Sequence, residues 1–272
     1  MEPMDLHTHS NMSDGTCTPS LLVEKAKAAG LGILALTDHD CIQGIPEAME
    51  AGERLGIRVV PGLELDTEFH TELHMLGLGV APQHPALQEF AARNAQRRQA
   101  RNEAILNQLA AAGVDVRPFF PAQHGTPTRL HVALALVAGG FAPTIGEAFR
   151  NYLFRGTPGY VETKRILPED AIALIHQAGG LAVLAHPCKV KADVAALVAR
   201  LHPAGLDGLE AFYPTATPGQ RDTYISMAQQ YDMLLTCGSD FHGDNRPDNR
   251  LGCTWQQSPL LEPVYTWLLQ RS

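Results

Sequence analysis

The chain has 272 residues, 45% of them hydrophobic and 18% charged, which is enough to bury one sizeable core. Its formal net charge of −8 argues against a broad nucleic-acid surface, unless metal ions offset the charge of buried carboxylates. Neither a basic, apolar leader nor a run approaching roughly 18 apolar residues occurs. We therefore expect a cytoplasmic protein without a membrane span.

Seven short apolar runs have the length of strands, and most are followed by a helical pattern. Helix signals lie between them, as where Thr18 and Pro19 open a helix that Gly30 ends. This alternation predicts an α/β fold of parallel βαβ units closed into a barrel, with its chemistry at the carboxyl ends of the strands. The predicted strands cover residues 4–6, 33–37, 58–60, 73–78, 181–185, 208–212 and 234–237.

The stretch between the fourth and fifth predicted strands contains helical patterns and no convincing strand. Its helices are predicted near residues 86–113, 129–139 and 145–156. The stretch is too long for a simple crossover. We therefore predict a helical cap, residues 85–164, inserted into a barrel domain made of residues 1–84 and 165–272.

Histidines and carboxylates fall on or near the end of every predicted strand. His7 and His9 stand two apart, so both side chains point to one face. Alone, this pair is more simply explained as polar residues at a strand end. The other strand ends supply Asp14, Asp38, His39, Glu64, His74, His186, Glu210, Asp240 and His242. Since the ends of parallel strands meet at one rim, the full set predicts a metal cluster.

Nitrogen and carboxylate ligands suit Mn²⁺, Zn²⁺ or Fe²⁺. The five cysteines form no CxxC pair, so a thiolate zinc site is not expected. The ligands exceed the needs of one ion, which predicts two or three divalent cations. Two such ions can share a bridging hydroxide and stabilise charge on a transferring phosphoryl group, so we expect hydrolysis of a phosphate ester.

The motifs DLHTHS, LALTDHD, PGLE, LHMLGLG, LAHP and GSDFHG together resemble the polymerase and histidinol phosphatase (PHP) family of phosphoesterases. The cap and the motif order are most similar to the branch of 3',5'-nucleoside bisphosphate phosphatases and 5'-to-3' exonucleases on short RNA. The resemblance implies a distorted seven-stranded (β/α)7 barrel, the PHP fold, with an inserted helical cap. It also implies a trinuclear metal site.

The resemblance assigns the ligands to three ions. His7, His9 and Asp240 would bind the first, with Glu64 as a bridge. Asp14, His39 and His242 would hold the second, and Glu64, His74 and His186 the third. The segment before His74 departs from the family pattern, so His70 remains an alternative to His74. Asp38 and Glu210 would support the ligands rather than bind metal.

Several basic residues are candidates for binding the substrate. Arg129 and His131 resemble an Arg-x-His pair of related caps, Lys164 and Arg165 begin the return to the barrel, and Arg246 follows the last metal motif. The alternative is a helix start and a solvated basic pair. Arg93, Arg97 and Arg101, with Arg98 beside them, predict either a guide for RNA or an ordinary solvated helix face. His84, His124, His176 and His202 match no motif.

We therefore expect a phosphatase that removes the 3'-phosphate of nucleoside 3',5'-bisphosphates, such as adenosine 3',5'-bisphosphate, through a metal-activated hydroxide. The nearest alternative is a 5'-to-3' exonuclease on short RNA. Histidinol phosphate hydrolysis and a non-catalytic PHP module are weaker alternatives. The expected partner is a nucleotide or a short RNA, with no obligate protein partner and no membrane.

Overall fold

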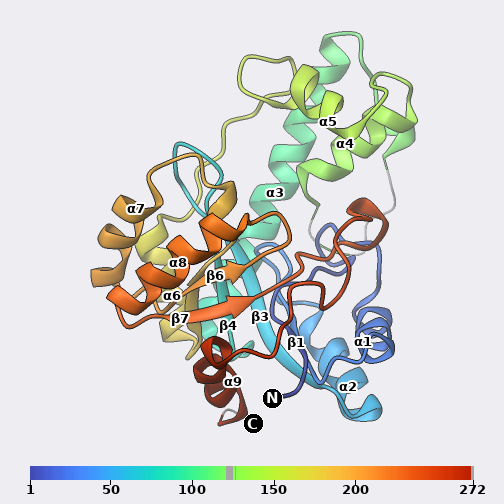
Figure 1. Cartoon of the computed structure of the whole chain (residues 1–272). Helices are drawn as coiled ribbons and strands as arrows, with labels where there is room; N and C mark the ends of the chain where they lie inside the picture. The colour runs from blue at the N-terminus through green and yellow to red at the C-terminus, as the bar shows by residue number, and fades with distance from the viewer. Residues whose placement is uncertain (121–124, 126, 271–272) are drawn as a thin grey trace. The chain divides into compact units, whose positions relative to one another are not determined.

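The seven predicted strands form one sheet in a computed structural model that describes residues 1–120, 125 and 127–270 (Figure 1). In the sheet they follow chain order, and the amide of Leu6 donates to the carbonyl of Cys237 at 3.0 Å. A bridge between Thr8 and Phe241 joins the same two ends, so the sheet nearly closes into the predicted barrel. The strands are β1 (Met4–Asp5), β2 (Ile33–Leu36), β3 (Arg58–Asp66), β4 (His74–Leu78), β5 (Leu181–Leu184), β6 (Gly208–Phe212) and β7 (Leu234–Cys237).

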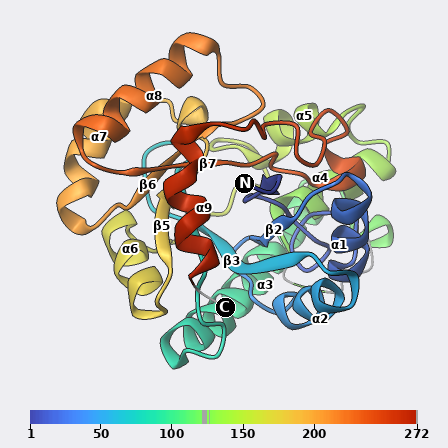
Figure 2. The ribbon, with the colours of Figure 1, turned by 60° about the horizontal axis from the view of Figure 1, so that its bottom comes forward.

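Helices surround the barrel (Figure 2). The helix predicted after Thr18 is confirmed, because the Thr18 hydroxyl accepts from the amide of Leu21 at 3.2 Å and Pro19 occupies the first turn. The barrel helices are α1 (Pro19–Ala28), α2 (Ile45–Leu55), α6 (Pro168–Gln177), α7 (Val194–Leu201), α8 (Pro218–Gln230) and α9 (Glu262–Leu269). Short 3-10 turns are η3 (Pro187–Lys189), η4 (His202–Ala204), η5 (Gly243–Asn245) and η6 (Pro259–Leu261).

β4 runs antiparallel to both of its neighbours, so the expectation of an all-parallel barrel is wrong at this strand. β3 and β4 are joined without a helix, and Leu73 O accepts from the Thr67 amide at 3.1 Å and the Thr67 hydroxyl at 2.7 Å. A direct reversal of this kind can only produce an antiparallel pair. Consequently His74, the first residue of β4, pairs with Asp66, the last residue of β3, at the rim.

β3 extends to Asp66, six residues beyond its predicted end. Pro61 has no amide to donate, and it is the last residue that pairs with β2 itself. From Gly62 onward β3 pairs with β4, and the chain that follows β2 stays beside it through the bridge between His39 and Glu64. A Cβ on Gly62 would lie 2.9 Å from Gly77 O and 3.1 Å from Leu36 O, so only glycine allows both neighbours to come this close. The extension places Glu64 inside the strand.

The contacts divide the chain into residues 1–91 with 165–272, and residues 92–164. The first break lies inside α3 (Pro85–Ala111). The second unit contains the 3-10 turn η1 (Arg117–Phe119), α4 (Arg129–Ala138), α5 (Ile145–Ala148) and the π-helix η2 (Phe149–Leu153). It has its own apolar core, formed by residues such as Leu109, Val132 and Leu136. His124 lies outside the described residues.

Within the described residues, no helix has the length and apolar character needed to cross a membrane.

Candidate metal centre

The strand ends bring the nine predicted ligands to one rim of the barrel. Eight of them are joined in three overlapping groups, in each of which one donor atom per residue lies within 4.8 Å of the others. The groups are His7, His9, Glu64 and Asp240; His9, Asp14, His39 and His242; and His39, Glu64 and His74. His186 contacts the third group through Glu64, with its Nε2 2.9 Å from Glu64 Oε1.

The first group has the dimensions of a tetrahedral metal site. His7 Nε2 lies 3.1 Å from His9 Nε2 and 3.3 Å from Glu64 Oε2. His9 Nε2 lies 3.3 Å from the same Glu64 oxygen. Asp240 Oδ1 is 3.5 Å from His7 Nε2 and 3.4 Å from His9 Nε2. A tetrahedron with metal–ligand distances of about 2.0–2.1 Å has edges of about 3.3 Å, so this donor set fits a small divalent ion.

The second group is wider and centres on Asp14. Asp14 Oδ1 lies 3.3 Å from His242 Nε2 and 3.9 Å from His9 Nδ1, and Oδ2 lies 3.8 Å from His39 Nε2. The resemblance assigned His9 to the first ion alone. Here its two ring nitrogens face different groups, since Nε2 belongs to the first and Nδ1 is the nitrogen nearest Asp14.

Glu64 stands between the groups. Its Oε2 faces His7 and His9, while its Oε1 is 2.9 Å from both His74 Nδ1 and His186 Nε2. This is the arrangement expected of a carboxylate that bridges two ions. His74 lies at the rim, with its Nδ1 2.9 Å from Glu64 Oε1, whereas the exposed His70 ring lies against Phe69 with the centroids 4.1 Å apart.

Asp66 belongs to the same rim and was missed by the sequence analysis. Its Oδ1 lies 3.2 Å from His39 Nδ1 and 3.3 Å from His74 Nε2. The available signal was the alternation Glu64-x-Asp66, which puts both carboxylates on one face of a strand. Ending the third strand at residue 60 concealed it.

Unpartnered nitrogens provide a separate test of whether the site fits cations. In the described part of the chain, His9 Nδ1 and His186 Nδ1 are buried ring nitrogens without a hydrogen bond, while His39 Nδ1 and His242 Nε2 are buried with carboxylate oxygens at 3.2–3.3 Å. A buried polar atom without a partner costs about 1–3 kcal/mol. Coordination to a cation would satisfy such an atom, so the residues present fit a metal cluster.

The acidic members of the cluster are held ionised. Burial alone would raise the pKa of Asp14, but His39 and His242 outweigh it and hold that pKa well below its usual range. The same balance lowers the pKa of Glu64, through His39, His7 and His74. Burial opposes the shift at Asp240 too, where Arg246, His7 and His242 hold the pKa well below its usual range. All three side chains are therefore ready to bind cations.

The imidazoles divide into two classes. At His39 burial favours the neutral ring, but Glu64 and Asp14 outweigh it and raise the pKa to about 10. The pKa of His7 is raised well above its usual range, because the charges of Glu210, Glu64 and Asp240 outweigh the effect of burial. Burial dominates at His186 and His242 and lowers the pKa of each to about 4. Without metal, protons on His7 and His39 balance the carboxylates.

Asp38 and Glu210 lie behind the ligands, as the sequence predicted. Glu210 is fully buried, its Oε1 and Oε2 lie 3.0 and 3.2 Å from His7 Nδ1, and Oε2 accepts from the amide of His186 at 2.7 Å. Because a carboxylate accepts at Nδ1, the ring of His7 keeps a proton there, and a cation bound at Nε2 would take the place of the second proton that the raised pKa puts on the ring. Asp38 accepts from Ser10 N, Ser10 Oγ and Ser13 Oγ at 2.8, 2.6 and 2.6 Å, which holds the loop before Asp14.

Asp240 has a second set of contacts that the sequence did not reveal. Its Oδ2 accepts from Tyr213 Oη at 2.6 Å, from Lys189 Nζ at 3.0 Å and from Arg246. Arg246 was predicted to bind substrate, and its guanidinium contacts Asp240, a predicted metal ligand. Asn249 donates to the carbonyl of Asp240 at 3.1 Å and steadies its φ of 54°.

The candidates in the second unit have local roles. His131 Nδ1 accepts from the amide of Thr128 at 3.0 Å and completes the capping box of α4, and the Arg129 guanidinium lies 5.9 Å from the ring centroid of Phe149. Lys164 offers its carbonyl to Arg97. In the first unit, Arg165 donates its amide to Glu68 Oε2 at 2.9 Å.

The expectation of a solvated arginine face on α3 is wrong for two of its members. Arg98 is 3% exposed and Arg101 is 7% exposed. Arg101 donates through Nε and Nη2 to Asn102 Oδ1 at 3.1 and 3.0 Å, and Asn102 in turn donates to Thr128 O at 3.2 Å. The spacing correctly placed these residues near one another on the helix, but it could not show that the helix face is covered.

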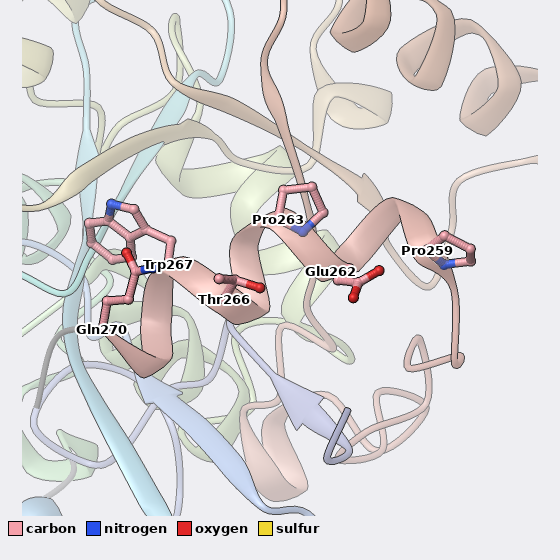
Figure 3. A pocket seen from close by; sticks show the side chains of 6 residues that line it. All are labelled: Pro259, Glu262, Pro263, Thr266, Trp267 and Gln270. Atoms are coloured by element: carbon pink, nitrogen blue, oxygen red, sulfur yellow. The ribbon is translucent and has the colours of Figure 1, made fainter.

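A surface hollow on α9 is lined by six residues, none of which is a predicted metal ligand (Figure 3). Arg58, the first residue of β3, donates to Leu268 O at 3.3 Å, so α9 covers the opposite end of the barrel from the rim. Glu262 is the single ionisable residue among those lining the hollow, which are Pro259, Glu262, Pro263, Thr266, Trp267 and Gln270. This lining offers no metal site.

Comparison with known proteins agrees with the geometry. The PHP domain family matches residues 5–200. The chain is 38% identical over 249 residues to the 5'-3' exoribonuclease Rnm of Salmonella typhimurium, which covers 88% of this chain and 84% of the relative. It is 32% identical over 280 residues to the 3',5'-nucleoside bisphosphate phosphatase of Chromobacterium violaceum, covering 100% and 98%.

A solved structure has the same fold. An amidohydrolase from Chromobacterium violaceum, with bound sulfate and no metal, superposes with a TM-score of 0.88 at 32% identity, covering 99% of this chain and 96% of that chain. With the barrel, the rim of ligands and these matches together, the chain belongs to the PHP domain family.

Proposed function

We propose that this chain is a metal-dependent phosphoesterase that removes the 3'-phosphate of nucleoside 3',5'-bisphosphates. The observation that carries the proposal is the group of His7, His9, Glu64 and Asp240, whose donor atoms are spaced as the ligands of one small divalent ion. The Chromobacterium relative named for this activity aligns with the whole chain. The sulfate in the solved relative supports an affinity for tetrahedral dianions.

The three groups would hold two or three ions of Mn²⁺, Zn²⁺ or Fe²⁺. Such ions polarise phosphoryl oxygens and lower the pKa of water, which supplies a nucleophile at neutral pH. The chain contributes the spacing of the groups through Glu64. It contributes the orientation of His7 through Glu210 and the ionised state of Asp14 and Asp240.

The second phosphate would be bound by the basic residues Arg129, His131, Lys164 and Arg165. The capping box restricts the role of His131, because its Nδ1 is already an acceptor from Thr128 N. The ring is then neutral with its proton on Nε2. His131 is therefore a hydrogen-bond donor in this proposal, and the leaving group takes its proton from water.

A 5'-to-3' exoribonuclease is the second candidate, and the Salmonella relative at 38% identity favours it. It would use the same metal groups. The net charge of −8 favours a small nucleotide over a longer polyanion. Histidinol phosphatase activity has no residue in its favour, and a non-catalytic module would be marked by missing ligands, whereas all nine predicted positions carry a ligand-type residue.

A comparison of three substrates tests the proposal. The protein is purified with manganese and assayed with adenosine 3',5'-bisphosphate, a 5'-phosphorylated trinucleotide and histidinol phosphate. The bisphosphate should show the highest kcat/KM and yield the 5'-monophosphate. A higher value for the trinucleotide would establish the exoribonuclease instead, and turnover of none of the three would refute the assignment.

A further inference from the structure

Lys189 lies at the edge of the metal groups, in a position that no motif indicated. It is the last residue of η3, three residues after His186. Its Nζ lies 3.0 Å from Asp240 Oδ2 and 4.8 Å from the ring centroid of Tyr213. The Lys189 side chain is 30% exposed, while that of Asp240 is 2% exposed. The ammonium group therefore stands where the buried cluster meets solvent.

The backbone of Lys189 is fixed relative to the predicted ligands. Its amide donates to the carbonyl of His186 at 2.9 Å, and the amide of His186 donates to the buried Glu210 at 2.7 Å. His186 itself has a φ of 30°, in the left-handed region, which a non-glycine residue adopts only when its surroundings hold it there. Lys189 thus belongs to the constrained strand end rather than to a free surface loop.

Asp240 Oδ2, the oxygen that Lys189 contacts, is approached by more hydrogen-bond donors than it has lone pairs. Asp240 Oδ2 also accepts from the Tyr213 hydroxyl at 2.6 Å and from Arg246. One carboxylate oxygen has about two lone pairs, and here three donors, two of them cations, converge on it. The single negative charge of Asp240 is therefore faced by two positive charges on this side. A site with surplus positive charge beside metal ligands favours an anion.

Lys189 also keeps donor capacity. An ammonium group has three N–H donors. Among the contacts of the described residues, Asp240 is the single hydrogen-bond partner of Lys189 Nζ. Two donors are therefore open to a ligand at the solvent side of the cluster. A compact ammonium is well suited to a terminal phosphate oxygen, which it binds as a point charge.

We propose that Lys189 binds a non-bridging oxygen of the phosphoryl group being hydrolysed, with Asp240 Oδ2 and Tyr213 holding the ammonium in place. The inference rests on the proposed phosphoesterase function. Because Lys189 is anchored to a predicted metal ligand, it serves the reacting phosphate. Its contribution is the same for any phosphate monoester.

Binding of inorganic phosphate to the manganese-loaded protein tests the assignment without a nucleotide. Isothermal titration calorimetry is performed on the wild type, Lys189→Gln, Lys189→Arg and the matched control Lys191→Gln, whose exposed lysine lies two residues later in the chain. Lys189→Gln should weaken phosphate binding by about 10- to 100-fold, the loss expected for one charge-assisted hydrogen bond. Lys189→Arg, which keeps the charge, should stay within about threefold of wild type. Manganese content should be equal in all four proteins.

Three results would overturn the assignment. The first is phosphate binding by Lys189→Gln as tight as that of Lys191→Gln. The second is loss of manganese in step with phosphate affinity, which would limit Lys189 to supporting Asp240. The third is a wild type that does not bind phosphate. A protein that binds phosphate as expected but ignores the nucleotide bisphosphate would refute the proposed substrate and leave Lys189 in place.

Discussion

Glu64, Asp240 and His7 are ionisable side chains with at most 1% of their surface exposed. Burial of charge costs free energy unless the charge is paired. Here His7 Nε2 lies 3.3 Å from Glu64 Oε2 and 3.5 Å from Asp240 Oδ1, so the imidazole and the two carboxylates compensate one another before any metal binds. In the folded chain the protonated histidines balance the carboxylates, and a bound cation can replace those protons.

Asp240→Asn tests the metal groups at the level of one side chain. Asparagine keeps the shape and tolerates the φ of 54°, but it lacks the charge. We expect phosphatase activity to fall by about 100-fold or more, with less bound manganese and an unchanged far-UV circular dichroism spectrum. The exposed Asp244, four residues later, provides the control Asp244→Asn. Full activity in Asp240→Asn would refute its role as a ligand.

Glu210→Gln tests the support behind His7. The amide can still accept from His7 Nδ1, but it loses the negative charge that stabilises the ring orientation. Manganese affinity, measured by calorimetry, should fall by about 10- to 100-fold. Glu262→Gln, on the exposed side of α9, should change nothing. Equal affinities in the two variants would show that Glu210 has only a packing role.

The β3–β4 hairpin is the element that completes the rim. A parallel β4 would place His74 at the far end of the barrel, because His74 is the first residue of the strand. The antiparallel direction instead brings it beside Asp66. Gly62 and Gly77 lie in this hairpin, and the close approach of their backbones depends on the missing side chains. The position of the third metal group thus depends on strand direction.

Gly62→Ala tests this close approach. The new methyl group would lie 2.9 Å from Gly77 O and 3.1 Å from Leu36 O, and backbone atoms cannot easily move away. We expect a loss of about 1–3 kcal/mol in the free energy of unfolding by urea. Gly219→Ala in α8 is the control, since no heavy atom lies within 4 Å of its Cβ position. A Gly62→Ala protein as stable as this control would contradict the packing argument.

For the whole molecule, metal binding and stability are linked through protons. In the metal-free protein the pKa of His39 is raised from 6.5 to about 10. A histidine with a raised pKa in the folded state stabilises the fold fully at pH values below its pKa in the unfolded state. This stabilisation is lost as the pH rises through its pKa in the folded state. His186 and His242, with lowered pKa values, act in the opposite sense, and they do so below pH 6.5. The pH dependence of stability above pH 6.5 therefore reports on the histidines whose pKa values are raised.

Thermal unfolding across that window checks the linkage. A metal ion takes the place of the proton on an imidazole, so the manganese-loaded protein should not lose this stabilisation. The difference in Tm between manganese-loaded and chelator-treated protein should widen as pH rises from 6.5 toward 10. Differential scanning calorimetry at a series of pH values measures it. A constant difference would indicate that His39 does not exchange a proton for a metal.

Local patterns in the sequence were enough to predict the seven strands and the meeting of several strand ends at one rim, because the alternation of strands and helices is visible within short segments and the ends of parallel strands converge. His7, His9, His39, Asp240 and His242 could be assigned to one rim for this reason. The capping of α1 by Thr18 was equally local. These features depend on neighbours in the chain, which a sequence displays directly.

The direction of β4, the place of Asp66 at the rim and the donors around Asp240 could not be predicted from the sequence. The first depends on the pairing of β4 with β3 and β5, the second on the approach of His39 to Asp66, and the third on the approach of Lys189 and Tyr213 to Asp240. Lysine and tyrosine occur in many settings, so their spacing carries no signal comparable to that of paired histidines. The burial of Arg98 could not be predicted either, because helical spacing shows which residues share a face of the helix but not what packs against that face.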